Sequence, residues 1–450
     1  MRRIKYIVMS IIAIMSIEFV SAQTLNTSYF MEGSYLRTNL NPALTPTRGY
    51  VTVPLLGGFT LDMSSNYLSV SNFFYKRGDE VVSALHESVS SEEFLGKLPN
   101  NAKMGLGLDM SIFSAGFYKH DMFWNFGLNL HSENDTVLSK DLFAALKTLG
   151  NGVYDLSNTS LNSNNYAELY VGTTRDILDW VTVGARVKFL IGICNISADI
   201  DDMYANVSAD TIEGRLRGTL RMSGAFIDTV GAVAGSEITD DIFGWGGINS
   251  FGAGIDLGAE VRLLDNRLRV SAAVTDLGFI CWSKKTSVEA VAMGDFHYNG
   301  VDIATGETDM AGEIKAVYGD NASKGYTKRL NCSLNIGAEY NILDDRIGFG
   351  LLSHTEFCNT MSYTELTASA NFRPLHWLSA SLSHTFLNRN RIGIFGCAVN
   401  IHPSGFNLFV GCDYIGFASA SYEGLSIPRN LKSFNIYAGI GFNIGELRKQ

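Results

Sequence analysis

The sequence predicts an all-β protein, a transmembrane antiparallel up-and-down β-barrel of about fourteen strands with short helices in its outer loops. Three observations support this fold class. Apolar and polar residues alternate along many segments, no long uncharged apolar stretch follows residue 22, and 45 Gly stand against only 7 Pro. Without a spanning helix, only a closed barrel pairs every backbone polar group in a bilayer. A soluble β-protein of this length is the alternative.

The first segment has the features of a secretory signal. Arg2, Arg3 and Lys5 form a basic start, residues 7–14 are apolar, and residues 20–22 (Val-Ser-Ala) form a small-residue cleavage site. We therefore predict a signal peptide at 1–22, an N-terminal periplasmic or plug segment at 23–49, and an outer-membrane β-barrel at 50–450. The expected location is the cell outer membrane, in contact with its lipid and lipopolysaccharide.

Alternation predicts the wall strands. In residues 103–112, the apolar side chains share one face and Gly105, Gly107, Asp109 and Ser111 share the other. Similar runs cover 181–189, 251–263, 268–274 and 330–338. Each run is about the length that a tilted transmembrane strand requires.

The number of strands follows from the short turns, which are rich in Asp, Asn, Gly or Pro. They are centred on 119–120, 175–176, 265–266, 344–345, 374–375 and 403–404. The six hairpins give twelve strands, and an opening strand at 50–63 and a closing strand at 434–444 give fourteen, an even number as expected for this class. The short turns and both termini then lie at the periplasmic rim.

Two outer connections carry helical patterns. Val82, Leu85 and Val89 follow one helical spacing, and a second pattern at 142–149 starts after Ser139 and stops at Gly150. Such helices either cap the barrel mouth or only pack on one another.

The charged residues of the wall decide which face meets lipid. One Arg or Lys facing hydrocarbon costs roughly 2–4 kcal/mol at the midplane, so these side chains must point into the lumen. Acids and bases are mixed, which favours internal ion pairing over a filter of one sign. The predicted lumen-facing charges are Asp109, Glu168, Arg186, Lys188, Asp256, Glu260, Arg262, Arg269, Glu339, Glu365 and Asp413.

The composition argues against several functions. A net charge of −10 without a basic patch excludes nucleic acid as a partner. The six Cys and eight His lack metal-ligand spacing, and the acids at 199, 201 and 202 form a solvated loop rather than a complete calcium motif. Ser-His pairs occur at 353–354 and 383–384, but no orienting acid is identified. No enzyme, metal or cofactor is therefore predicted.

One strand departs from regular alternation. Pro54 removes a backbone donor within the opening strand, and Gly57 and Gly58 follow it. A strand start or structural bulge explains this pattern, and a kink that forms a lateral exit is the functional alternative.

Short motifs resemble a known group of proteins. Asn41-Pro42-Ala43, before the first strand, resembles the NPA element of FadL-type fatty-acid transporters and PorV-like barrels. The run from 274 to 280, which contains Asp276 and Gly278, and the following Trp282 resemble a family of uncharacterised outer-membrane barrels common in Bacteroidetes. The resemblance implies a fourteen-stranded barrel with an N-terminal plug, although residues 23–49 are short for a full hatch.

The resemblance supports two functional expectations. The first is passage of a small apolar molecule across the outer membrane, with that molecule as the ligand. The second is a non-transporting role as the partner of a secreted or surface-attached protein, as in PorV-like barrels. A third functional class is an enzyme at the barrel rim, for which no orienting acid is identified.

Overall fold

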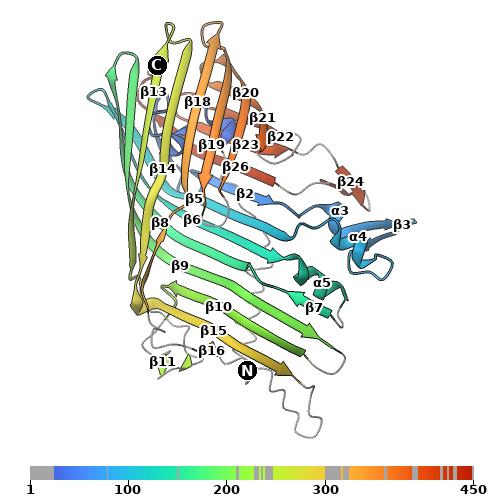
Figure 1. Cartoon of the computed structure of the whole chain (residues 1–450). Coiled ribbons are helices and arrows are strands. Elements are labelled where there is room, and N and C mark those ends of the chain that lie inside the picture. The colour runs from blue at the N-terminus through green and yellow to red at the C-terminus, as the bar shows by residue number, and fades with distance from the viewer. Residues whose placement is uncertain are drawn as a thin grey trace.

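The computed structural model shows a closed antiparallel β-barrel of 14 strands (Figure 1), as the sequence predicts. The predicted signal peptide lies outside the described residues. The structure describes residues 25–78, 80–148, 152–208, 212–227, 233–234, 237–238, 247–298, 316–317, 324–358, 362–387, 394–415, 419–422, 425–428 and 433–447.

Fourteen strands pair in chain order around the wall, and the first of them is split into two parts. They are β1 (Gly49–Thr52) with β2 (Phe59–Ser65), β5 (Asn101–Lys119), β6 (Met122–Ser139), β8 (Thr159–Leu178), β9 (Val181–Val207), β13 (Ser250–Leu263), β14 (Leu268–Trp282), β18 (Cys332–Ile342), β19 (Ile347–Phe357), β20 (Tyr363–Leu375), β21 (Leu378–Leu387), β22 (Ile394–Ile401), β23 (Asn407–Ile415) and β26 (Ser433–Ile444).

The split strand closes the barrel. Both β1 and β2 pair antiparallel with β26 on one side and with β5 on the other. Since every wall strand then has two neighbours, no edge is exposed within the membrane.

Side chains of the wall alternate between two environments. Along β9, Val187 and Phe189 are 64% and 47% exposed on the outside, whereas Arg186 and Lys188 are 1% and 4% exposed inside. The exposed apolar residues continue around the wall on β8, β13, β14, β19 and β21. An apolar exterior around a polar lumen is the arrangement that a bilayer requires, and the protein is accordingly an outer-membrane protein.

Tight turns join the strands at one rim, which also holds the C-terminus at the top of Figure 1. His120 and Asp121 take positive φ between β5 and β6, as hairpin turns demand. The turn predicted at 175–176 lies four residues further on, at 179–180. Asp176 belongs to β8, where it accepts a hydrogen bond from Thr182 Oγ1 at 2.5 Å.

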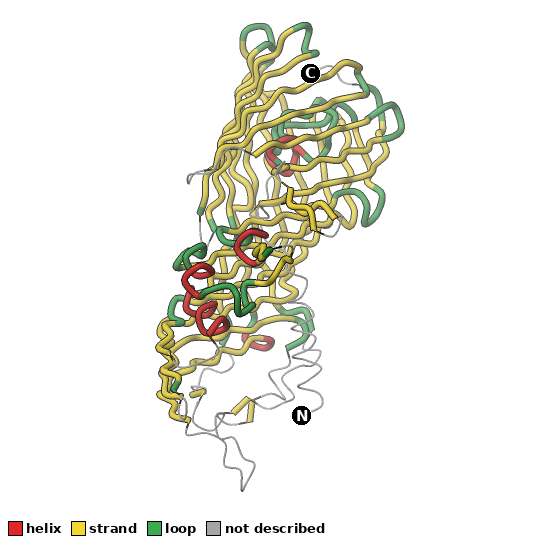
Figure 2. Tube along the Cα trace, turned by 90° about the vertical axis from the view of Figure 1, so that its right-hand side faces the viewer, coloured by secondary structure: helices red, strands yellow, loops and turns green. Residues whose placement is uncertain are grey.

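Four wall strands extend well beyond the membrane: β5, β6, β8 and β9. At about 3.3 Å per residue, the 27 residues of β9 far exceed the about 9–11 that a crossing needs. Figure 2 shows the resulting elongated molecule, with the barrel at one end and this extension at the other. Further strands join the extension or the adjoining wall: β7 (Gly152–Asp155), β10 (Ile212–Gly224), β15 (Ser287–Tyr298), β16 (Ala316–Val317) and β17 (Tyr326–Arg329).

Short helices and hairpins lie at the outer end of the molecule. They are α3 (Val70–Phe73), α4 (Ser91–Leu95), α5 (Lys140–Thr148), η3 (Lys284–Thr286), and the pairs β3 (Phe74–Arg77) with β4 (Glu80–Ser83), β11 (Val233–Ala234) with β12 (Glu237–Ile238), and β24 (Ser419–Tyr422) with β25 (Leu425–Pro428). None of the helices that the structure describes has the length and apolar character to cross a membrane.

The two predicted loop helices have different outcomes. The pattern at 142–149 forms α5, and the Oγ of Ser139 accepts a hydrogen bond from the Asp141 backbone at 3.3 Å. The helix predicted at 82–89 is wrong. Val82 belongs to β4, Leu85 is 59% exposed and Val89 is 1% exposed. Val82 and Val89 both contact the cluster that contains Phe94 on α4, whereas Leu85 is exposed, so the three side chains do not share one face.

Candidate functional site

Residues 25–48, here called the plug segment, lie inside the barrel and fill its lumen. The segment contains two short helices, η1 (Asn26–Ser28) and α2 (Arg37–Leu40), and most of its side chains are buried. Its backbone bonds to the wall: Arg373 donates to the Phe30 carbonyl at 2.8 Å, and Asn407 donates to the Gly33 carbonyl at 2.9 Å. Such a segment closes the lumen by specific polar contacts.

The NPA motif forms a turn that docks on the wall. The Asn41 Oδ1 accepts a hydrogen bond from the Ala43 backbone at 2.9 Å, and its Nδ2 donates to the Tyr29 hydroxyl at 3.2 Å. On the wall, Thr174 Oγ1 donates to the Pro42 carbonyl at 2.6 Å. Asn41 is 0% exposed. The motif therefore holds the plug segment in place.

Two wall glycines make room for this turn. Gly184 on β9 and Gly258 on β13 face each other in register. A Cβ at Gly184 would overlap the Pro42 carbonyl, and one at Gly258 would overlap the Asn41 side chain. These glycines are required by a close approach of the plug segment rather than by their backbone conformation.

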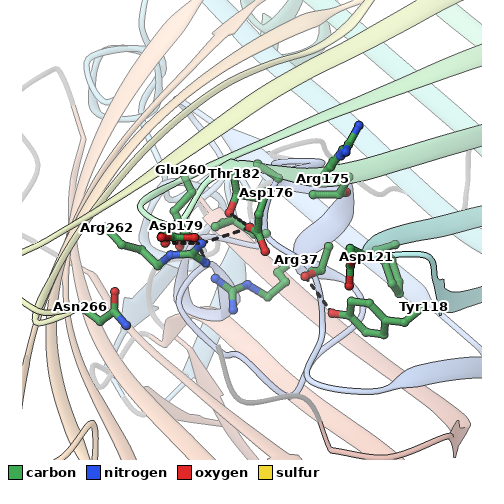
Figure 3. A pocket seen from close by; sticks show the side chains of 15 residues that line it. Arg37, Tyr118, Asp121, Arg175, Asp176, Asp179, Thr182, Glu260, Arg262 and Asn266 are labelled. Carbon is green, nitrogen blue, oxygen red and sulfur yellow. Dashed lines mark hydrogen bonds and ion pairs between the residues drawn. The ribbon is translucent and has the colours of Figure 1, made fainter.

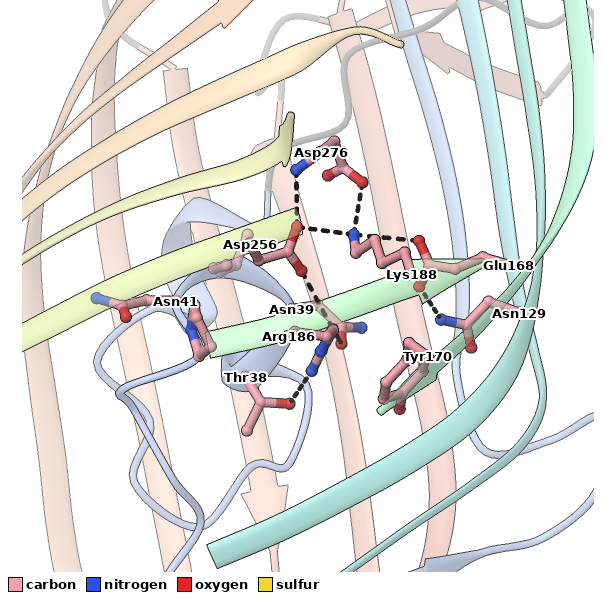
Figure 4. A network of polar contacts seen from close by, with 12 residues as sticks. Thr38, Asn39, Asn41, Asn129, Glu168, Tyr170, Arg186, Lys188, Asp256 and Asp276 are labelled. Atoms are coloured by element: carbon pink, nitrogen blue, oxygen red, sulfur yellow. Dashed lines mark hydrogen bonds and ion pairs between the residues drawn. The ribbon is translucent and has the colours of Figure 1, made fainter. Parts of the chain in front are cut away.

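A buried lysine in the middle of the lumen binds several carboxylates (Figure 4). Lys188 Nζ lies 3.1 Å from Glu168, 3.0 Å from Asp256 and 2.6 Å from Asp276. One ammonium therefore contacts three carboxylates from three wall strands. Removing it would leave those acids close together without their common partner.

Arg186, next to Lys188 on β9, links this network to the plug segment. Its guanidinium donates to Asn39 Oδ1 at 3.0 Å and to Thr38 Oγ1 at 3.2 Å, and it lies 3.8 Å from Asp256. It also stacks over the Tyr170 ring, 4.2 Å from the ring centroid. The wall network and the plug segment are thus one connected system.

The second family motif shapes this network. Asp276 takes φ +61° at a bulge in β14, where the register against β13 shifts, and its backbone N–H donates to Asp256 Oδ1 at 2.8 Å. A bulge re-aims a side chain, which here brings the Asp276 carboxylate to Lys188. A Cβ at Gly278 would overlap the Ala253 carbonyl of β13. Trp282 is 2% exposed and packs in an apolar cluster with Tyr166.

Glu32 of the plug segment forms a second ionic contact with the wall. It pairs with Arg269, and Arg373 lies 3.9 Å away while binding Glu339 at 2.6 Å. Burial by itself would raise the pKa of Glu32, but Arg373 and Arg269 lower it to about 2. Glu32 is therefore a carboxylate that the two arginines hold ionised.

The predicted lumen charges are all buried or half-buried. Besides those in the two networks, Asp109 lies 2.6 Å from His131, and Arg262 lies 3.1 Å from Asp176 and 3.9 Å from Glu260. The remaining two contact the plug segment: Glu365 accepts from Asn26 Nδ2 at 2.8 Å, and Asp413 accepts from the Thr27 backbone at 3.2 Å.

A polar pocket opens beside the plug segment at the short-turn rim (Figure 3). Its volume is about 270 Å³, and Arg37, Glu260 and Arg262 lie among its lining residues. Arg37 is 3% exposed, and its Nε and Nη1 atoms have no hydrogen-bond partner among the described residues. Burial lowers the pKa of Arg37 despite the nearby Glu260.

A smaller chamber lies on the outer side of the plug segment. Its volume is about 100 Å³, and its lining includes Leu36, Gly58, Lys188 and Asp276. Ligand sites usually measure about 300–1,000 Å³, so this chamber has room for a few waters but not for a sizeable ligand while the plug segment stays in place.

The opening strand is interrupted at residues 53–58. Leu55 takes φ +65°, and Leu55 and Leu56 are 54% and 56% exposed on the outside. The wall nevertheless remains hydrogen-bonded here, since Ile440 N–H donates to Leu56 O at 2.8 Å. On the inside, the Tyr35 hydroxyl of the plug segment donates to the Gly57 carbonyl at 2.7 Å.

The remaining sequence candidates do not converge on a reactive centre. Within β21, His384 lies between the rings of Phe386 and Phe395, whereas Ser383 is buried in the lumen. Neighbours in a strand point to opposite faces, so this pair does not form a catalytic contact. The acids at 199–202 lie in β9, and no metal-binding group of His, Cys, Asp or Glu is found among the described residues.

Sequence reasoning missed several residues of the lumen. It did not assign Glu32, Arg37 or Arg373 to the site, and it gave Asp276 no electrostatic role. The sequence does contain a signal of the bulge at Asp276. Outward apolar positions fall on even numbers up to Val274 and on odd numbers from Leu277 onward, a change of parity that a bulge produces.

The comparisons with known proteins place the chain in a family. The model of the family of unknown function (DUF5723) matches residues 42–413. The chain belongs to this family. The DUF5723 match begins within the NPA motif and includes Asp276, Gly278 and Trp282. No curated protein sequence matches the chain.

Several solved outer-membrane channels are similar to this DUF5723 protein. A deltaS2S3 mutant of the monoaromatic hydrocarbon channel TodX is 8% identical, with 95% of this chain and 96% of that chain covered and a TM-score of 0.42. A FadL homologue of Pseudomonas aeruginosa is 9% identical, with 94% and 98% covered and a TM-score of 0.42. The toluene transporter TbuX of Ralstonia pickettii is 8% identical, with 93% of each chain covered and a TM-score of 0.40.

These TM-scores are too low to carry an argument about function. The architecture of the DUF5723 protein is given by its own strand pairing.

Proposed function

We propose that the protein passes a small apolar molecule across the outer membrane when the plug segment shifts. One observation carries this proposal. Most of the lumen is polar or charged, but near the strand interruption a buried cluster of apolar and aromatic side chains joins the plug segment to the wall. The cluster includes Leu36, Tyr35, Tyr50, Phe409 and Tyr437.

The cluster continues from the plug segment to the wall. The rings of Tyr35 and Tyr50 stack at 4.6 Å, and the ring of Phe409 meets Tyr35 edge-on at 5.3 Å. Aromatic surfaces of this kind suit an apolar or aromatic molecule. Charged surfaces elsewhere in the lumen would not repay its burial.

The interruption at Pro54, Gly57 and Gly58 supplies a candidate exit toward the membrane. The Tyr35 hydroxyl bonds the Gly57 carbonyl from inside, and two leucines face hydrocarbon outside. If Tyr35 moves with the plug segment, the interruption loses its inner contact. An apolar molecule would then leave sideways into lipid, where it is soluble.

Uptake by intact cells tests this function. Cells that carry the wild-type protein should accumulate radiolabelled toluene faster than cells without it, and Tyr35→Ala should increase the rate because it removes the contact with Gly57. Tyr340→Ala is the matched control, since Tyr340 lies on the outside of β18 and is 43% exposed. Equal uptake with and without the wild-type protein would refute the proposal.

A direct location of the ligand complements uptake. Crystals soaked in bromobenzene should show anomalous bromine density within the aromatic cluster. Bromine confined to the lipid-facing exterior would count against this route.

A second candidate function uses the outer extension instead of the lumen. In that case the protein is a non-transporting partner of a secreted or surface-attached protein, as its resemblance to PorV-like barrels suggests. The projecting strands β5, β6, β8 and β9 favour this role, since they offer a surface far outside the bilayer. Co-purification of one secreted protein, lost when the outer hairpin 74–83 is removed, together with no toluene uptake, would select it.

A further inference from the structure

A large open cavity lies at the outer end of the lumen, on the inner face of the extension. Its volume is about 740 Å³, which falls within the usual range of about 300–1,000 Å³ for ligand sites. We call it the outer vestibule. Its lining consists of Asn101, Lys103, Val137, Asn158, Ser160, Asn162, Asn195, Ser197, Asp199, Arg221, Tyr326, Thr327, Lys328 and Arg329.

A bulge in β9 gives the vestibule part of its lining. The register of β9 against β8 shifts between Gly192 and Cys194. Below this shift, even-numbered residues such as Lys188 face the lumen, and above it the odd-numbered residues Asn195 and Ser197 line the vestibule. The polar inner surface therefore continues outward past the membrane.

The charge of the vestibule differs from that of the whole chain. The chain carries a net charge of −10, yet the lining holds four cationic side chains and a single acid, Asp199. Arg221 is neutralised, because Glu289 lies 2.6 Å away. Lys103 and Lys328 have no ion-pair partner within the part of the chain that the structure describes. Arg329 pairs in register with the outward-facing Phe279 of β14, so its side chain points to the outside of the wall.

Lys328 is a lining cation with a hydrogen bond to its polar surroundings. Its Nζ donates to Asn162 Oδ1, a neutral partner, and the neighbouring Tyr326 hydroxyl donates to Asn195 Oδ1 at 2.6 Å. Lys328 is half-buried. Glu133, Asp135 and Asp199 are near enough to act on Lys328 electrostatically, but none of them forms an ion pair with it. A cation in this setting has lost part of its water without a carboxylate in direct contact, so an anion from solution has a favourable place to bind.

The uncharged lining indicates the rest of the ligand. Eight of the lining residues carry an amide or hydroxyl group. Val137 is the only aliphatic residue of the lining. Amides and hydroxyls pair well with a molecule that carries many hydroxyl groups of its own. An apolar ligand would leave these groups without partners.

We propose that the outer vestibule binds a saccharide that carries a phosphate or carboxylate group. Lys103 and Lys328 receive the anionic group, and the amides and hydroxyls of β8 and β9, together with Tyr326 of β17, receive the sugar hydroxyls. This binding is independent of passage through the lumen and is measured without it.

Titration calorimetry on the full-length protein in detergent tests the site, with glucose 1-phosphate as the probe. Glucose lacks the phosphate group and inorganic phosphate lacks the sugar hydroxyls, so each should bind more weakly than glucose 1-phosphate. Lys103→Gln with Lys328→Gln should weaken binding of glucose 1-phosphate about tenfold for each cation removed. Arg215→Gln is the matched control, because Arg215 is exposed on β10, pairs with Asp202 and does not line the vestibule.

A second arm separates the sources of the ligand. Purified lipopolysaccharide replaces the soluble sugar phosphate, since its phosphorylated sugars offer the same chemistry from the surrounding membrane. Binding of either probe that the double variant weakens and Arg215→Gln preserves supports the site. Binding of neither probe, or equal binding to the wild-type protein and the double variant, overturns it.

Discussion

The lumen and the outer vestibule differ in whether their charged side chains are paired. In the lumen, Lys188 contacts three carboxylates, and Glu32 contacts two arginines. In the vestibule, cations outnumber acids and several lack an ionic partner among the described residues. Buried charges survive only when paired, whereas open ones are hydrated and remain available. The lumen charges therefore secure the plug segment, and the vestibule charges are free to meet a ligand.

The largest effect should follow from breaking the Lys188 network. Lys188→Met leaves three carboxylates without their ammonium and should lower the free energy of unfolding by about 3–5 kcal/mol. Urea unfolding in detergent measures the change. Lys119→Met, at the exposed rim between β5 and β6, serves as the control. Equal stability of Lys188→Met and the wild-type protein would show that these charges are not mutually stabilising.

The contact of Glu32 with the wall should make stability depend on acid. Its pKa is about 2 in the folded protein against a usual value of 4.5, so its contribution is complete above pH 4.5 and is lost as the pH falls toward 2. The shift corresponds to about 3 kcal/mol. Unfolding measured from pH 6 to pH 2 should show a loss in the wild-type protein that Glu32→Gln lacks. Parallel profiles for the two proteins would contradict this assignment.

A smaller effect is expected where the NPA turn meets the wall. Gly258→Ala places a methyl group against Asn41 and should cost about 1–3 kcal/mol through overpacking, while making the plug segment more sensitive to protease. Gly254→Ala on the same strand is the matched control, because its nearest neighbour would lie 3.6 Å away. Equal proteolysis of both variants would mean that the turn does not depend on this glycine.

The smallest effect on stability should come from the vestibule. Lys103→Gln with Lys328→Gln removes two charges without an ion-pair partner in the described structure and should change the free energy of unfolding by no more than about 0.5 kcal/mol. Urea unfolding compares this double variant with Lys188→Met. A loss as large as that of Lys188→Met would remove the proposed difference between the two regions.

Much of the wall was predictable from residues close in sequence. The alternation around Arg186 and Lys188 placed these side chains on one face, and the cost of exposing them to hydrocarbon chose that face as the inner one. The strand number followed from the turns. Errors occurred where local pattern competes with packing, as at 82–89, where Val89 is buried by α4 instead of continuing a helix.

The sequence by itself determined the barrel, its strand number and its inner and outer faces, because a period of two and the insolubility of charge in lipid are local properties. Only the tertiary structure decided which charges meet. The bulges at Asp276 and Ile193 each shift one residue and redirect the side chains that follow. The plug segment has no periodic signal, and its partners lie hundreds of residues away, so its docking on Gly184 and Gly258 emerges only when the barrel has closed around it.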